Sequence, residues 1–188
     1  MIILYQGAST QVSASLDGLP GNSLPIKSFD PLNLANWGSE ETFQWFRCAE
    51  IKNGRVAMVA TTGYIVQAAG FHFPGQLSSD VSFEQLSSMK PFDAWAEVPA
   101  AGKAQILATI FIAEWISETQ GTHYMKGGQF PTMVFPPIDF SNVSDATMQR
   151  KRTSEINNGR LAMIAIMSFI AANAVPGSVP ALAGLDMF

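Results

Sequence analysis

A long motif occurs twice in this sequence and constrains its fold more than any other feature. The first copy reads RCAEIKNGRVAM from Arg47 to Met58, and the second reads RTSEINNGRLAM from Arg152 to Met163. Each copy leads into an apolar stretch without an internal proline, which favours a helix. Two related helices in one chain predict a pair that packs about a pseudo-twofold axis.

The charged residues of the repeat need partners on another helix. Within one copy, the Glu and the Arg five residues later point in different directions, because five residues turn a helix by about 500°. A charge that faces hydrocarbon costs several kcal/mol and is normally paired with an opposite charge. In a crossed pair, Glu50 can meet Arg160, and Glu155 can meet Arg55. The glycine between the charges of each copy would let the two backbones approach closely.

Each copy also carries an asparagine three residues after its Glu. If the ion pairs only locked two helices together, these amides would lie without a role in a place where an unsatisfied amide is costly. The amide oxygen suits magnesium, which favours oxygen ligands, and so does the second oxygen of a Glu already neutralised by Arg. The repeat therefore predicts both ion pairs that join two helices and magnesium ligands, namely Glu50, Asn53, Glu155 and Asn158.

The composition excludes several other classes of protein. Charged residues make up 14% of the chain, whereas a soluble domain usually has about 25%. A net charge of −4 provides no basic surface for nucleic acid, and the single cysteine, Cys48, excludes a disulfide framework. The sequence shows no catalytic constellation and no phosphate-binding glycine loop. We therefore expect a protein that is not an enzyme.

Three apolar stretches lie at about residues 43–73, 102–119 and 145–175, with prolines clustered between them. Their uninterrupted apolar cores span about 15 to 18 residues, slightly fewer than the roughly 20 that cross a bilayer. They would cross only if partners satisfied the neighbouring polar residues inside the membrane. We expect an all-α membrane protein with three transmembrane helices, the first and third crossed. Residues 43–188 would form this membrane domain, after an arm of residues 1–42.

The pattern E-x-x-[NH]-G-R-x-A-M, present twice around a middle helix, resembles the chlorophyll a/b and chlorophyll a/c light-harvesting family. The similarity covers about residues 47–175. The segment GYIVQAAGFHFPG, from Gly63, resembles the fucoxanthin- or peridinin-type chlorophyll a/c branch, and SEINNGRLAMIAIMSFIAANAVPGSVPAL, from Ser154, is most similar to dinoflagellate members. The resemblance implies three transmembrane helices, with two carotenoids in the grooves of the crossed pair.

The resemblance also assigns roles to residues of the repeat. Glu50 and Glu155 match the family's ion-paired magnesium ligands, with Arg160 and Arg55 as their partners. Asn158 matches the asparagine ligand of the third helix.

Further candidate ligands lie outside the repeat. Gln67 follows on the first helix, with an amide at the membrane interface as the alternative. Family members use a Gln and a Glu on the middle helix, where this chain has Gln105 and Glu114. Glu118 is the alternative acid there, and a solvated helix end is the other interpretation of it.

The chain departs from the family's pattern at two positions. Most members have His where Asn53 stands, and an amide is a weaker axial ligand than imidazole. Most members have Gln where Ala172 stands, so that chlorophyll is absent or held through water or backbone. The two histidines, His72 and His123, lie near helix ends, as peripheral chlorophyll ligands or as plain interfacial residues.

The resemblance implies a light-harvesting antenna that binds chlorophyll a, chlorophyll c and carotenoids of the peridinin, diadinoxanthin or fucoxanthin type. Its implied partners are a photosystem core, with photosystem I favoured, neighbouring antenna subunits and lipids. A photoprotective quencher of the same family is the alternative function. A transporter that uses the intramembrane charges as a relay is a third, but mutual pairing of those charges argues against it.

The resemblance and the distribution of basic residues agree on location and orientation. The implied location is the plastid thylakoid membrane, with several passes. The opening segment has no basic region and no apolar run of signal-peptide length, which predicts a mature chain or one made where it works. Basic residues gather in the second loop, at about residues 121–152. By the positive-inside tendency, this loop and the N-terminal arm face the stroma, and the first loop faces the lumen.

Overall fold

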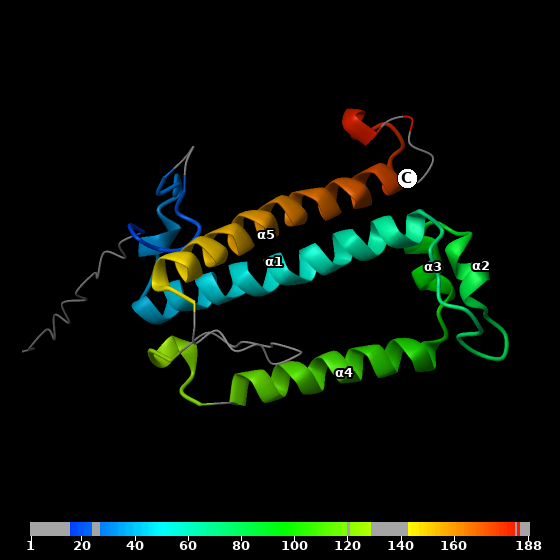
Figure 1. Ribbon diagram of the computed structural model, residues 1–188, viewed down its shortest axis with the longest axis horizontal. Coiled ribbons are helices and arrows are strands. Elements are labelled where there is room, and N and C mark those ends of the chain that lie inside the picture. Colours follow the sequence, from blue (N-terminus) through cyan, green and yellow to red (C-terminus); the bar gives the residue numbers. More distant parts are fainter. Residues whose placement is uncertain (1–15, 24–26, 120, 129–142, 183, 185–188) are drawn as a thin grey trace, which may run out of the picture.

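Three long helices dominate the computed structural model, which describes residues 16–23, 27–119, 121–128, 143–182 and 184. They are α1 (Glu40–Ala68), α4 (Ala100–Thr119) and α5 (Asp145–Ala174) (Figure 1). The shorter elements are α2 (Phe83–Ser87), α3 (Pro91–Glu97) and the 3-10 turns η1 (Leu34–Asn36), η2 (Tyr124–Lys126) and η3 (Pro180–Leu182). Apart from one isolated bridge, the described residues contain no β-structure. The predicted all-α fold class is confirmed for this part of the chain.

Local capping explains the bounds of α1. The Ser39 hydroxyl accepts a hydrogen bond from the Thr42 amide at 3.4 Å, and two acidic residues follow in the first turn, where the helix dipole favours them. At the other end, Gly70 adopts a φ of +80° and donates its amide to the Gln67 carbonyl at 2.9 Å. A glycine in this left-handed conformation ends a helix. The helix therefore stops at Ala68, whereas the apolar stretch had suggested a continuation to residue 73.

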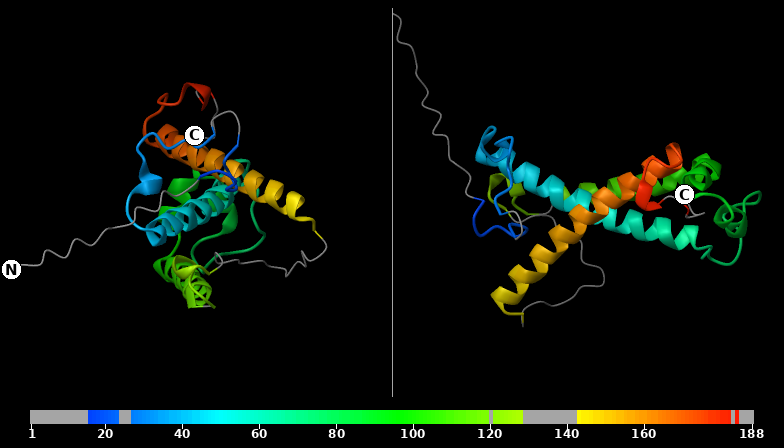
Figure 2. Two further views of the ribbon diagram at one scale, coloured as in Figure 1. Left: turned by 90° about the vertical axis from the view of Figure 1, so that its left-hand side faces the viewer. Right: turned by 90° about the horizontal axis from the view of Figure 1, so that it is seen from above.

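Helices α1 and α5 cross in direct contact (Figure 2). Glycines lie at the contact: a Cβ atom added to Gly159 would come within 2.9 Å of the Gly54 Cα atom. Buried alanines continue the contact on each helix, Ala57 on α1 and Ala162 on α5. The Thr61 hydroxyl donates a hydrogen bond to the Ala162 carbonyl at 3.3 Å. Small side chains thus let the two backbones approach closely, as the repeat predicts.

Helix α4 lies beside α1, on the side opposite α5 (Figure 1). None of its residues is buried, although much of its surface is apolar. Its exposed large side chains are Ile106, Leu107, Ile110, Phe111, Ile112, Trp115 and Ile116. Within the described ranges, no helix combines the length and the apolar character that a membrane crossing requires.

Aromatic contacts hold the short helices against the end of α1. The buried Tyr64 ring of α1 lies 5.5 Å from the Phe92 ring of α3 and 5.0 Å from the Phe169 ring of α5. Leu86 of α2 and Ala94 of α3 are also buried. The end of α1 therefore packs on α2, α3 and α5 together.

The turn η2 packs against the first half of α1 through Tyr124. This side chain is buried and shares a hydrogen bond with the buried Cys48 thiol. Burial, together with that thiol, raises the pKa of Tyr124 to about 12. The chain that follows α4 is thereby tied back to α1.

We predict that Gly159→Ala destabilises the crossing by about 1–3 kcal/mol, because the added methyl group meets the backbone of α1. Gly63→Ala is the matched control, since a Cβ atom there meets nothing within 4 Å. That substitution should stabilise α1 by roughly 0.5–1 kcal/mol. Urea unfolding followed by circular dichroism measures both changes. Equal effects of the two substitutions would contradict the close contact.

Candidate functional site

Two ion pairs join α1 and α5 on either side of the glycine contact. Arg160 Nη2 of α5 lies 2.7 Å from Glu50 Oε1 of α1. Arg55 Nε of α1 lies 2.6 Å from Glu155 Oε1 of α5. Each carboxylate of the repeat thus meets the arginine of the other copy, and the crossing neutralises all four charges.

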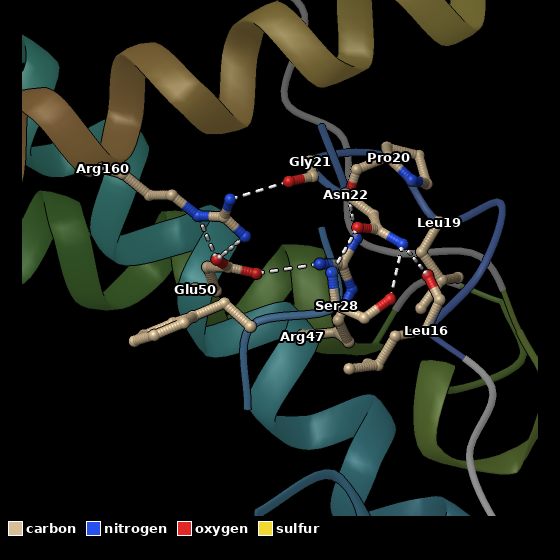
Figure 3. Close-up of a pocket in the computed structure, with 10 residues that line it drawn as sticks. Leu16, Leu19, Pro20, Gly21, Asn22, Ser28, Arg47, Glu50 and Arg160 are labelled. Carbon is tan, nitrogen blue, oxygen red and sulfur yellow. Dashed lines mark hydrogen bonds and ion pairs between the residues drawn. The ribbon is translucent and has the colours of Figure 1, made fainter. Parts of the chain in front are cut away.

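Glu50 has a second arginine partner within its own helix. Arg47 Nη1 lies 2.9 Å from Glu50 Oε2, while Arg160 occupies the other carboxylate oxygen (Figure 3). Arg47 also donates from Nη2 to the Pro20 carbonyl at 2.9 Å. The sequence interpretation missed this contact, although its signal was present: a basic residue three positions before an acid lies on the same helix face.

The second copy of the motif lacks the equivalent contact. Arg152 corresponds to Arg47, yet it is exposed and forms no ion pair with the described residues. Glu155 Oε2 accepts no hydrogen bond from that same set of residues. The two carboxylates are therefore unequal: both oxygens of Glu50 are engaged, and one oxygen of Glu155 has no partner in the described part of the chain.

The N-terminal arm covers the Glu50 side of the crossing. Arg160 Nη1 donates to the Gly21 carbonyl at 2.8 Å, and the Gly21 amide donates to Thr153 Oγ1 at 3.4 Å. Asn157 Nδ2 of α5 donates to Ser23 Oγ at 3.0 Å. Together with the charged side chains, the arm lines an open cavity of about 310 Å³ (Figure 3). No contact between this arm and the repeat was expected from the sequence.

The two asparagines of the repeat are exposed on the flanks of the crossed pair. Asn158 Nδ2 donates to Ser154 Oγ at 3.5 Å, which leaves the amide oxygen without a partner among the described residues. Asn53 makes no side-chain hydrogen bond within the described ranges. Two accessible amide oxygens beside a neutralised charge pair are the donors that magnesium prefers. The chemistry of these two side chains therefore suits a ligand of the magnesium in a chlorophyll.

A third charged cluster ties α4 to α1. Lys52 Nζ lies 2.6 Å from Glu114 Oε2 and 2.5 Å from Glu118 Oε1. Glu118 Oε2 also lies 2.8 Å from His123 Nε2. Glu114 and Glu118, the two acids considered as ligands, thus neutralise Lys52 of the repeat. The second copy has Asn157 at the position of Lys52. The interpretation of Glu118 as a plain solvated helix end missed these partners.

The remaining candidates are spread along the helices rather than gathered at the crossing. Gln105 is exposed on α4, and Gln67 of α1 donates from Nε2 to the Leu86 carbonyl at 3.3 Å. His72 lies in the exposed segment after α1. Ala172, which stands where the family usually has Gln, is buried in α5.

We predict that neutralising the partner carboxylate has different effects in the two ion pairs. Arg55→Leu leaves Glu155 without a described ion-pair partner, so adding Glu155→Gln should recover about 0.5–3 kcal/mol. Arg160→Leu leaves Glu50 paired with Arg47, so adding Glu50→Gln should recover nothing. Double-mutant cycles from urea unfolding measure both couplings. Equal recovery in the two pairs would contradict the observed asymmetry.

Comparison with known proteins places this site in a family. Residues 12–174 match the family described as Chlorophyll A-B binding protein. The matched range includes both copies of the repeat. Fucoxanthin-chlorophyll a-c binding protein of Chattonella marina var. antiqua is 33% identical over 173 residues, which cover 90% of this chain and 74% of the relative.

Two further relatives show a similar degree of likeness. Fucoxanthin-chlorophyll a-c binding protein C of Phaeodactylum tricornutum is 34% identical, over 80% of this chain and 75% of its own length. The relative from Trieres chinensis is 31% identical, over 92% of this chain and 86% of its own length. These relatives agree with the resemblance to the chlorophyll a/c branch seen in the segment that begins at Gly63. The chain therefore belongs to the chlorophyll a/b-binding protein family.

Proposed function

We propose that this chain, a light-harvesting protein by its family, binds chlorophyll a, chlorophyll c and carotenoids and passes their excitation energy to a photosystem. The family consists of pigment-binding proteins and not of enzymes, which confirms that expectation. The relatives are described as chloroplastic proteins that bind fucoxanthin and chlorophylls a and c. The crossed and charge-neutralised pair of α1 and α5 is the observation that carries the proposal.

The role of the crossed pair is to hold ligands at fixed separations. Chlorophyll held by these helices would supply light absorption and excitation transfer by dipole coupling, which depends on distance and orientation. A glycine contact and two ion pairs join α1 to α5, so ligands on either helix keep a constant relation to one another. Ligands on rigid helices are positioned more precisely than ligands on loops.

Four residues of the repeat are the proposed ligands of chlorophyll magnesium. Asn158, Asn53 and Glu155 each present an oxygen without a described partner. Glu50 Oε2 accepts one hydrogen bond from Arg47, and a carboxylate oxygen has a second lone pair that remains available. Outside the repeat, we propose ligands at Gln105 and Glu114, whereas Gln67 donates from Nε2 to the Leu86 carbonyl in a cavity that it shares with His72.

The apolar surface supports a location in the thylakoid membrane. Helix α4 buries none of its residues, and α1 and α5 also expose large apolar side chains. Exposed apolar areas of this extent mark binding sites for apolar partners, here pigment and lipid. We propose that residues 43–188 form a three-helix membrane domain in which α1, α4 and α5 each cross once.

The proposed orientation places the basic loop and the arm in the stroma. The expected loop before the third span ends in a basic run at residues 150–152. Loops rich in basic residues tend to stay on the side of the membrane from which the protein is inserted. Parts of both segments, at residues 1–15, 24–26 and 129–142, lie outside the described residues. The proposed partners are neighbouring antenna subunits and a photosystem core, with photosystem I as the first to be tested.

The proposal predicts a specific loss of pigment from Asn158→Leu. Wild-type protein refolded with chlorophylls and carotenoids should take up both, and Asn158→Leu should hold one chlorophyll fewer, because its amide oxygen is removed. Asn157→Leu is the matched control, since that neighbouring amide contacts the arm. Chromatography of the extracted pigments gives the stoichiometry. A wild-type protein that takes up no chlorophyll would overturn the proposed function.

If wild type binds pigment but Asn158→Leu retains every chlorophyll, only the assignment of this ligand fails. The amide would then serve the contact with Ser154 alone.

A further inference from the structure

A second candidate site lies at the far end of α1 from the arm. A cavity of about 250 Å³ opens where α1 meets α2 and α3, the elements that Figure 1 places together at one end of the molecule. Most of its lining is apolar or aromatic, and it includes Val66, Phe71, Phe73, Phe83 and Trp95. Three polar side chains also line it, His72, Gln67 and Ser87, and the Ser87 hydroxyl donates to the Glu84 carbonyl at 2.8 Å.

The hydrogen bond of His72 determines which ring nitrogen can bind a metal. Its Nδ1 atom lies 3.1 Å from the Phe73 carbonyl oxygen. A carbonyl can only accept, so Nδ1 carries the proton in this contact. The neutral ring then has a lone pair on Nε2, and none of the described residues forms a hydrogen bond with that atom. Histidine ligands in metalloproteins are oriented in this way, by a hydrogen bond from the other ring nitrogen to a carbonyl.

Gln67 lines the same cavity and forms a hydrogen bond with its wall. Its Nε2 donates to the Leu86 carbonyl at 3.3 Å, which connects α1 to the end of α2. Its amide oxygen is a neutral donor, weaker than an imidazole nitrogen as an axial ligand. The cavity therefore contains one strong ligand and one side chain that shapes its wall.

The chemistry of this lining selects a particular class of ligand. A bare metal ion needs several ligands, and no group of three or more potential metal-binding side chains occurs in the described part of the chain. A magnesium tetrapyrrole needs only one axial ligand and an apolar surface for its ring. Around His72, the Phe71 and Phe73 side chains are 72% and 76% exposed, and Trp95 is 47% exposed. Flat aromatic surface of this kind can pack against a macrocycle.

We propose that His72 Nε2 is the axial ligand of a chlorophyll magnesium bound in this cavity. The inference rests on the proposed function, because it takes the ligand class from it. It assigns the site to the histidine and not to Gln67. The segment between α1 and α2 thereby becomes part of the pigment-binding surface.

The test is refolding with chlorophylls and carotenoids, followed by pigment stoichiometry for several variants. His72→Leu should hold one chlorophyll fewer than wild type. His72→Gly should lose the same chlorophyll and regain it when imidazole is added during refolding, while imidazole leaves wild type unchanged. Gln76→Leu is the control, because it places an apolar side chain in the same exposed segment but outside the cavity. It should retain every pigment.

The outcomes separate this site from the proposed function. If wild type binds chlorophyll and His72→Leu retains all of it, the inference is wrong and the proposed function stands. A loss in Gln67→Leu with none in His72→Leu would assign the site to the amide and also overturn the inference. Loss of all pigment from His72→Leu without rescue of His72→Gly by imidazole would show a structural role instead. A wild type that binds no chlorophyll would overturn both proposals.

Discussion

The contact between Gly54 and Gly159 is the constraint on which the rest of this structure depends. Because neither residue has a side chain, the backbones of α1 and α5 meet, and the charges that flank each glycine come within ion-pair distance of the other helix. A larger residue at either position would separate the helices and both ion pairs together. The glycines and the charges therefore act as one unit, which explains why the motif occurs as an intact repeat.

The two copies of the repeat have nevertheless diverged in what surrounds them. Arg47 and Arg160 engage the two oxygens of the Glu50 carboxylate and also donate to carbonyls of the arm, whereas one oxygen of Glu155 has no partner among the described residues. Lys52 of the first copy contacts α4, whereas Asn157, its counterpart in the second copy, contacts the arm. The two copies thus form equivalent ion pairs with each other, but Lys52 of the first copy contacts the middle helix and Asn157 of the second contacts the N-terminal arm.

How much the sequence could predict follows from where each contact originates. The repeat contains both members of each interhelical pair, so the amino-acid sequence alone is enough to match Glu50 with Arg160. The Lys52 cluster joins the repeat to a helix without a recognisable motif, and only the position of α4 brings Glu114 and Glu118 to it. The end of α1 at Ala68 depends on the backbone conformation of Gly70. The pattern of apolar residues in the sequence does not indicate that conformation.

The fluorescence excitation spectrum of the purified pigment–protein tests the central claim most directly. If the crossed helices hold chlorophyll c and carotenoids at fixed short distances from chlorophyll a, light absorbed by either should appear as chlorophyll a emission. The excitation spectrum should then follow the absorption spectrum through the carotenoid and chlorophyll c bands. Emission excited only through the chlorophyll a bands would contradict the account, because the helices would then bind pigment without arranging it for energy transfer.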